Sequence, residues 1–283
     1  MASILIADSG STKTDWFFKG EDGEVISFKS AGLNPYFYTP DELSSEINQA
    51  IPSKIDRKTK VEVTFYGSGC SSSERQGEIS EAIKNAFPNA ETEVYSDLMA
   101  AARCSLGREK GMVVIIGTGS NVALFDGERI TDTIQSLGYM FGDEASGAWF
   151  GKALMTDFLT GKMPKQVSDH FADWHKLTFE QILEKTYRNN QPSRFLASMV
   201  PFMNLHLSND YVSSLLTQGF EAFFNAMASQ LPTQNGEVIG AVGSIAYHFK
   251  PFLEKSANTR GFKLSTVTNT PIEGLKSFHR LCE

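Results

Sequence analysis

Two stretches of the chain carry the same pattern, an apolar run that leads directly into a small polar turn. The first reads ILIADSGST over residues 4–12, the second reads VIIGTGSN over residues 114–121, and a further β-rich run follows each turn. A strand, a turn without bulky side chains and a second strand leave backbone N–H groups open to a ligand. Because the pattern occurs twice, it predicts a duplicated domain, with the two turns facing each other across a cleft.

The rest of the chain alternates short β-rich runs with segments of helical period, and this alternation indicates an α/β fold. The strand at 112–116 is apolar throughout, which is typical of a strand buried on both faces. Strands are expected near residues 3–7, 15–19, 24–29, 61–66, 112–116, 122–125, 237–242 and 262–267. Helices are expected at 39–51, through most of 144–230 with breaks at 161–164, 189–192 and 207–210, after 243 as far as 255, and at 271–281.

The length of the chain allows two domains. It has 283 residues, of which 41% are hydrophobic, and this is enough to build two cores. The second set of strands opens at Gly111, so the boundary falls near residues 106–110. We expect a first domain over 1–108 and a second over 109–270 that carries a helical insertion. Whether the final helix, about 271–283, packs back on the first domain is left open.

Charge and cysteine content narrow the class of function. The formal net charge of −7 argues against a nucleic-acid-binding protein, because such proteins concentrate Lys and Arg on one face. Cys70, Cys104 and Cys282 are too far apart for a disulfide framework or a Cys-x-x-Cys metal site. No apolar stretch approaches the roughly 20 residues that cross a membrane. We therefore expect a cytoplasmic protein with a small-molecule substrate and with neither nucleic-acid nor membrane partners.

The two polar turns suit phosphate binding. Gly10, Ser11 and Thr12 form the first, and Gly117 to Asn121 form the second; neither has the spacing of a Walker A loop, and neither leads into a helix as a dinucleotide fingerprint does. One isolated cluster of this kind is best read as an ordinary hairpin turn, but two matched clusters favour phosphate binding. Lys13 either pairs with a phosphate or extends into solvent, and the sequence does not separate these readings.

Two carboxylates stand at the ends of predicted strands. Asp8 can hold Mg²⁺ through water molecules, or it can accept N–H bonds from the adjacent turn; the cost of burying an unpaired carboxylate favours Mg²⁺. Asp97 follows the strand end at 94–96 and begins a helix, so it can orient or deprotonate a substrate hydroxyl. The helix N-terminus is expected to keep Asp97 ionised and only weakly basic. Capping of that helix by Ser96 or Asp97 explains the segment equally well.

Two glycine-rich segments complete the set of candidates. Residues 138–147 (GYMFGDEASG) precede a predicted helix, and Asp143 within them can accept sugar hydroxyls; the alternative is a loop with an N-cap. Residues 240–246 (GAVGSIA) place Gly243 and Ser244 between a strand and a helix, which leaves room for a flat ring or a ribose. The alternative, close packing of helix on strand, is favoured for this segment taken alone.

Taken together, these segments resemble the sugar kinase, Hsp70 and actin superfamily, and within it the family of N-acetylglucosamine kinases and BadF/BadG/BcrA/BcrD-type ATPases. The order of motifs is similar over nearly the whole chain. Residues 8–15 (DSGSTKTD) resemble the first phosphate motif, 117–121 (GTGSN) the second, 138–147 the sugar-kinase signature and 240–246 the adenosine motif.

The resemblance implies two ribonuclease-H-like domains of the actin-like ATPase type, with ATP and Mg²⁺ in an interdomain cleft that closes over the acceptor. It also implies that Asp97 is the catalytic carboxylate and that Asp8 holds Mg²⁺ through water. The residues implied for ATP and phosphate binding are Gly10, Ser11, Thr12, Lys13, Gly117, Thr118, Gly119, Gly243 and Ser244. Those implied for acceptor binding are Asn34, Ser120, Asn121 and Asp143.

The implied function is an ATP-dependent kinase of amino-sugar metabolism that phosphorylates a hydroxyl, O6, of N-acetylglucosamine, and a homodimer is one arrangement that the resemblance allows. Leu137 stands where the animal enzymes carry a Trp, so an expected contact to the sugar or its acyl group is missing. Glucosamine, N-acetylmannosamine and muramic-acid derivatives therefore stay open as acceptors. Activator-type ATPases without a sugar acceptor need paired cysteine ligands for an iron–sulfur cluster, which Cys70 and Cys104 do not offer. A sensor without turnover is a third reading, against which the presence of both Asp8 and Asp97 argues.

Overall fold

The computed structural model describes residues 2–10, 12–188, 190–228, 230–232 and 236–281, and it divides into two compact units. Unit 1 comprises Met1–Gly107 together with Pro271–Glu283, and unit 2 comprises Arg108–Thr270. The chain passes from one unit to the other twice, so unit 1 is discontinuous in sequence.

Unit 1 is built on a five-stranded sheet of order β3-β2-β1-β4-β5. Its strands are β1 (Ser3–Ser9), β2 (Lys13–Lys19), β3 (Val25–Ala31), β4 (Val61–Gly67) and β5 (Ala90–Ser96). The first three form an antiparallel meander, and β4 and β5 run parallel to β1. The hairpin predicted from residues 4–12 is confirmed, and its register places Asp8 opposite Asp15 and Ser9 opposite Thr14.

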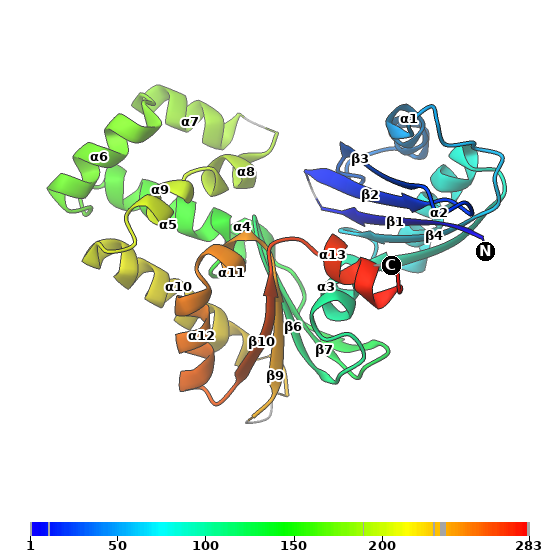
Figure 1. Cartoon of the computed structure of the whole chain (residues 1–283). Coiled ribbons are helices and arrows are strands. Elements are labelled where there is room, and N and C mark those ends of the chain that lie inside the picture. Colours follow the sequence, from blue (N-terminus) through cyan, green and yellow to red (C-terminus); the bar gives the residue numbers. More distant parts are fainter. Residues whose placement is uncertain (1, 11, 189, 229, 233–235, 282–283) are drawn as a thin grey trace. The chain divides into compact units, whose positions relative to one another are not determined.

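Helices cover both faces of this sheet. They are α1 (Pro40–Ala50), α2 (Ser73–Ala86), α3 (Asp97–Ser105) and α13 (Ile272–Phe278). Figure 1 shows α1 and α2 on one face and α3 with α13 on the other. Leu5 and Ala7 of β1 belong to the core beneath α1 and α2, whereas Ile6 between them points to the opposite face, as strand alternation requires.

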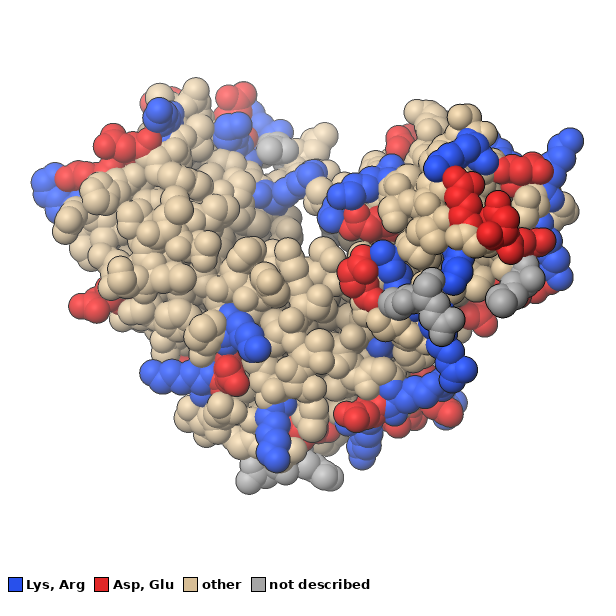
Figure 2. Space-filling view, viewed as in Figure 1, with Lys and Arg blue, Asp and Glu red and all other residues tan. Residues whose placement is uncertain are grey.

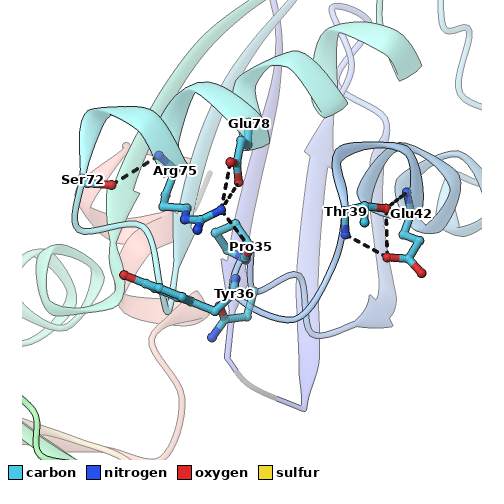
Figure 3. A network of polar contacts seen from close by, with 8 residues as sticks. Pro35, Tyr36, Thr39, Glu42, Ser72, Arg75 and Glu78 are labelled. Carbon is cyan, nitrogen blue, oxygen red and sulfur yellow. Dashed lines mark hydrogen bonds and ion pairs between the residues drawn. The ribbon is translucent and has the colours of Figure 1, made fainter.

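The helix predicted at 39–51 is α1, and a capping box fixes its start. The Thr39 hydroxyl accepts the Glu42 N–H at 3.3 Å, and the Glu42 carboxylate accepts the Thr39 N–H at 2.8 Å (Figure 3). These two bonds satisfy N–H groups that have no partner within the helix.

Unit 2 repeats the sheet of unit 1, with the order β10-β9-β6-β7-β8. Its strands are β6 (Gly111–Ile116), β7 (Ser120–Phe125), β8 (Ile130–Thr133), β9 (Val238–Val242) and β10 (Lys263–Thr268). Here too the first three strands form an antiparallel meander, while β9 runs parallel to β6 and β10 parallel to β9. Read from β8 to β10, the order matches that from β3 to β5 strand for strand. The predicted duplication is thereby confirmed, and both sheets have the ribonuclease-H-like topology.

A helical insertion between β8 and β9 packs against the sheet of unit 2 (Figure 1). Its core joins Val114 and Ile116 of β6 with Phe150 of α5 and Phe220 of α10. The inserted helices are α4 (Gly138–Phe141), α5 (Gly147–Leu159), α6 (Lys165–His175), α7 (Phe179–Tyr187), α8 (Pro192–Ala197), α9 (Pro201–Leu205) and α10 (Asp210–Ala228). Helices α11 (Ser244–His248) and α12 (Lys250–Thr259) lie between β9 and β10. The helical stretch predicted within 144–230 is confirmed, and helices end near each of the three predicted breaks, although residue 189 of the second lies outside the described residues. The chain also leaves the helix at 176–178 and 198–200, which the sequence did not predict.

The surface carries charges of both signs. On the face that Figure 2 shows, acidic and basic side chains are interspersed on both units, and on unit 2 they lie mostly toward its edge. Among the described residues, no helix has both the length and the apolar character needed to cross a membrane.

Candidate functional site

The turn between β1 and β2 is the first candidate phosphate-binding element. The Gly10 N–H donates to the Lys13 carbonyl at 3.0 Å, and Thr12 is exposed. Ser11, which the sequence also assigns to this turn, lies outside the described residues. The Lys13 ammonium forms an ion pair with Asp15 at 2.6 Å. This ion pair, which the sequence did not predict, holds the Lys13 ammonium beside the turn.

Asp8 lies at the end of β1 in a cluster of acidic groups. Burial is the main cause that raises the pKa of its carboxyl to about 7; nearby Asp15 and Asp97 contribute to the rise, and Lys13 opposes it. Ser11 of the adjacent turn lies outside the described residues, so both readings of Asp8, as a magnesium ligand and as an acceptor of turn N–H bonds, stay predictions. An acidic group held among other acids has the electrostatics of a cation site.

Asp97 occupies the first position of α3, directly after the cap. The Ser96 hydroxyl caps the helix by accepting the Met99 N–H at 3.4 Å, and one oxygen of Asp97 accepts the Leu98 N–H at 2.9 Å. Burial raises the pKa of Asp97 to about 6, although bonds from the backbone N–H groups of Leu98 and of Asp97 itself lower it. The expectation that the helix N-terminus keeps Asp97 weakly basic is therefore wrong, because burial outweighs the helix N-terminus.

Asn34 follows β3 and is almost fully buried. Its Oδ1 accepts the Tyr36 N–H at 2.9 Å, and its Nδ2 lies 3.5 Å from the Ser68 hydroxyl. Gly69 has φ +82°, and a Cβ there would collide with the Asn34 carboxamide. The Leu33 N–H donates to the Ser9 hydroxyl at 2.9 Å, which ties this segment to the strand that leads into the first turn.

The second polar turn, in unit 2, is bonded to the glycine-rich signature. At the start of α5, the Gly147 N–H donates to the Gly117 carbonyl at 2.7 Å, and the Ala148 N–H donates to the Thr118 carbonyl at 3.0 Å. The Ser120 hydroxyl donates to the Glu144 carbonyl at 2.9 Å. The second turn and the signature, which are separate motifs in the sequence, are thus joined by hydrogen bonds within unit 2.

The backbone of the signature adopts a conformation that is unusual for non-glycine residues. Asp143 and Ala145 both have φ +58°, in the left-handed region. A Cβ at Gly119 would lie 2.9 Å from the Asp143 carboxylate, so this turn passes the acid closely. Burial raises the pKa of Asp143, and the Ser120 N–H opposes this effect. Residues in sparsely populated backbone conformations gather at functional sites, which is consistent with a ligand-binding role for Asp143.

Gly243 directly follows β9, has φ +120° and packs on the second turn. A Cβ at this position would collide with the Ile116 carbonyl and lie 3.1 Å from the Gly117 nitrogen. The neighbouring Ser244 is exposed. Close packing, the alternative weighed from the sequence, is therefore present, and it places this segment against the candidate phosphate turn.

A pocket of unit 2 contains three of the four residues implied for acceptor binding, namely Ser120, Asn121 and Asp143. It has about 480 Å³ of space, part of it open to solvent. The Asn121 Oδ1 accepts the Val122 N–H at 2.8 Å, which leaves its NH₂ group available as a donor. The other lining residues are Val122, Ile134, Gln135, Ser136, Leu137, Phe141, Gly142, Glu144, Phe223, Ala226, Met227 and Gln230.

Sequence reasoning missed the wall of this pocket that α10 supplies. Phe223 of α10 is buried in the core of unit 2, and it also lines the pocket. Leu137 is 55% exposed and lines the pocket beside Phe141. No local signal relates residues of α10 to Asp143, because only tertiary packing brings them together.

Comparison with known proteins places the chain in a family. No family model matches it. A proposed N-acetylglucosamine kinase from Porphyromonas gingivalis shares 36% identity, with 98% of each chain covered and a TM-score of 0.86. A proposed N-acetylglucosamine kinase from Chromobacterium violaceum shares 18% identity over 98% of this chain and 99% of its own, with a TM-score of 0.74. A ROK family glucokinase from Streptomyces griseus, in complex with glucose and AMPPNP, shares 12% identity over 99% of each chain with a TM-score of 0.55, a likeness of fold. The chain thus belongs to the N-acetylglucosamine kinase family, has the fold of the actin-like ATPases and is an ATP-dependent sugar kinase.

Proposed function

We propose that the protein phosphorylates the O6 hydroxyl of an N-acylated amino sugar, with N-acetylglucosamine as the first candidate. The composition of the unit 2 pocket carries this proposal. It combines the carboxylates of Asp143 and Glu144 with the carboxamides of Asn121 and Gln135 and with an apolar side. Carboxylates accept hydrogen bonds from sugar hydroxyls and from an amide N–H, and carboxamides both accept and donate such bonds.

The charge of the pocket favours neutral acceptors over acidic ones. Its lining residues include two carboxylates and neither Lys nor Arg. The Lys152 ammonium, which moderates the pKa of Asp143, donates to the Tyr139 carbonyl at 3.2 Å and is not a lining residue. An acidic acceptor such as a muramic-acid derivative would place its carboxylate near like charges, which costs free energy. The pocket therefore favours a neutral acyl amino sugar, and Leu137 and Phe141 offer apolar contacts for its acyl group.

The chemistry we assign to Asp97 is proton acceptance from the acceptor hydroxyl. As O6 attacks the γ-phosphorus, the new O–P bond forms, the bond from phosphorus to the ADP oxygen breaks, and the hydroxyl proton passes to the carboxylate. A carboxyl whose pKa is about 6 is ionised at neutral pH and is a stronger base than an ordinary Asp. Because phosphoryl transfer has a loose transition state, orientation of the hydroxyl by Asp97 contributes as well.

The two polar turns and their neighbours are assigned to nucleotide binding, and Asn34 is assigned to the acceptor. We assign the nucleotide phosphates to the first turn, with Lys13 as its cation, and to the second turn. We assign the adenosine to the segment of Gly243 and Ser244, which packs on the second turn. Asn34 is assigned to the acceptor. The phosphate-binding residues in this proposal are Gly10, Ser11, Thr12, Lys13, Gly117, Thr118 and Gly119.

Asp8 fits a magnesium ion held through water. Its pKa is raised by burial and by two neighbouring acids, so a divalent cation would stabilise its ionised form. The described residues contain no group of three His, Cys, Asp or Glu side chains that could enclose a metal ion. This suits Mg²⁺, which keeps several waters and takes its other ligands from substrate phosphates. When bound, the ion would neutralise charge on the transferred phosphoryl group.

The activator-type ATPase gains no support from the cysteines. Cys70 is buried, and burial raises the pKa of its thiol to about 12; burial raises the pKa of Cys104 as well. Ligation of a cluster needs thiolates, which these surroundings disfavour. Amino-sugar metabolism in the cytoplasm is the setting that our proposal implies, and a homodimer stays a prediction.

The test is ADP release with Mg²⁺ across a panel of N-acetylglucosamine, glucosamine, N-acetylmannosamine, N-acetylmuramic acid and glucose. We expect N-acetylglucosamine to stimulate wild-type turnover most, and Asp97→Asn to lower kcat by about 10²–10⁴. The exposed Asp41→Asn serves as a matched control with unchanged kcat. Phosphorus-coupled NMR of the product identifies the oxygen that is phosphorylated. Preference for N-acetylmuramic acid would overturn the charge argument, and sugar-independent hydrolysis that Asp97→Asn leaves unchanged would favour the activator class.

A further inference from the structure

Arg75, in the first turn of α2, contacts a loop about forty positions earlier in the chain. Its guanidinium donates to both oxygens of Glu78 at 2.9 and 3.0 Å and to the Pro35 carbonyl at 3.4 Å. It also lies over the Tyr36 ring, 4.9 Å from the ring centroid (Figure 3). The Glu78 pairing fixes the guanidinium, and the fixed guanidinium then fixes residues 35 and 36.

The loop that Arg75 contacts contains Asn34. The Tyr36 N–H donates to Asn34 Oδ1 at 2.9 Å, and the Phe37 N–H donates to the Asn34 carbonyl at 2.9 Å. Oδ1 already accepts a backbone N–H, and the Ser68 hydroxyl, 3.5 Å from Nδ2, takes at most one of the two N–H donors of the carboxamide. The NH₂ group therefore keeps a donor for a ligand. The orientation of Asn34 therefore depends on the position of Tyr36.

Burial does not explain this arrangement. The Tyr36 ring is 63% exposed and Phe37 is 75% exposed, so hydrophobic packing contributes little to holding the loop. An Arg–Glu pair within one helix that is still partly open to solvent also adds little stability by itself. The contacts of Arg75 to Pro35 and Tyr36 are what distinguish it from an ordinary surface ion pair.

We propose that Arg75 is a positioning residue for the sugar acceptor: through Pro35 and Tyr36 it holds the Asn34 carboxamide with its NH₂ group directed to an oxygen atom of the acceptor. This proposal rests on the proposed function, in which Asn34 binds the acceptor. It extends the acceptor site to a residue of α2 that does not itself touch the sugar. It also predicts that Asn34 recognises an acceptor oxygen, since its own oxygen is occupied.

The test compares Arg75→Ala with Arg57→Ala. Arg57 is a matched control, because it also bonds a side-chain oxygen and a carbonyl, both of Asn48, at 2.6 and 2.8 Å. We expect Arg75→Ala to raise the acceptor KM about tenfold, the equivalent of one hydrogen bond, with kcat and the ATP KM within about twofold of wild type. Arg75→Lys keeps the positive charge but loses the planar guanidinium, so its acceptor KM should lie between those of the wild type and Arg75→Ala. An unchanged acceptor KM in folded Arg75→Ala, or an equal rise in the ATP KM, overturns the proposal.

Amide hydrogen exchange separates this proposal from the proposed function. If no sugar stimulates the wild type, the proposed function fails, and exchange of residues 33–38 still reports on the contact. We expect faster exchange there in Arg75→Ala and Arg75→Lys, and wild-type exchange in Arg57→Ala. Equal exchange in all variants overturns the role of Arg75 whatever the activity.

Discussion

Arg103 of α3 contacts both the sheet of unit 1 and helix α13, and its removal should lower the stability of the protein. It stands in the last turn of α3, donates to the buried Tyr66 hydroxyl at 2.7 Å, and lies 4.1 Å from the Tyr95 ring centroid. The Phe278 ring of α13 lies 5.1 Å away, and His279 Nε2 is 2.9 Å from the same Tyr66 hydroxyl. The guanidinium thus holds α13 to the sheet.

The magnitude follows from these contacts. Arg103→Ala removes a charge-assisted hydrogen bond worth about 2 kcal/mol. It also removes half-buried cation–π contacts worth about 1 kcal/mol together. The sum of about 3 kcal/mol corresponds to a fall in Tm of roughly 6–10 °C for a chain of this size. Tyr66→Phe keeps the ring and loses the same hydrogen bond, so its free energy of unfolding should fall by about 2 kcal/mol.

Thermal unfolding followed by circular dichroism, with hydrogen exchange of residues 272–281, measures the effect. Exchange in α13 should accelerate in Arg103→Ala, and Arg57→Ala, which lacks aromatic partners among the contacts described above, should melt with the wild type. A fall in the Tm of Arg103→Ala by less than about 2 °C, or unchanged exchange in α13, would refute the role assigned to Arg103.

Three further predictions concern pH and backbone packing. The raised pKa of Asp97 requires its proton to leave before it can act, so kcat/KM for the acceptor at saturating Mg²⁺ should fall about tenfold per pH unit below about 6 and be flat in Asp97→Asn. Burial lowers the pKa of His279 to about 4, so as the pH falls the unfolded chain takes up a proton on this side chain before the folded chain does. The contribution of His279 to stability should therefore be complete above about pH 6.5 and be lost as the pH falls toward 4. Measurement of Tm against pH should show this decline in the wild type and a smaller one in His279→Gln. Gly243→Ala forces a Cβ against the Ile116 carbonyl at φ +120°, so it should weaken nucleotide binding measured by calorimetry, whereas Gly236→Ala, with open space around the added Cβ, should not.

The repeated hairpins were the part of the fold most accessible from sequence. Apolar runs ending in glycine turns predict β1 and β6 and the strands that follow them, and both hairpins are present. The predicted β1 stops at residue 7, whereas the strand continues through Asp8 and Ser9, because these polar residues pair with β2. Helix α2 is absent from the predictions although Ile79, Ala82 and Ile83 share one helical face. Its many polar residues and Gly77 weaken the periodic signal.

The candidate site was predictable in its residues more than in its electrostatics. Asp97 is selected by its place after a strand, but its pKa depends on burial, which no local pattern reports. The contact of Arg75 with Tyr36 and the α10 wall of the pocket depend on packing between distant segments. The sequence positions of such pairs carry no period or motif that joins them.

The discontinuity of unit 1 has a consequence during translation. At about 5–20 residues per second, the ribosome needs on the order of ten seconds to make residues 108–270 before α13 emerges. Throughout that interval the nascent chain lacks Phe278 and His279, so the surface of α3 and β4 that they cover stays open to solvent and to chaperones. Unit 2 has its whole sequence before unit 1 does. We therefore expect the later part of the chain to reach its native state first, against the usual N-to-C order of cotranslational folding.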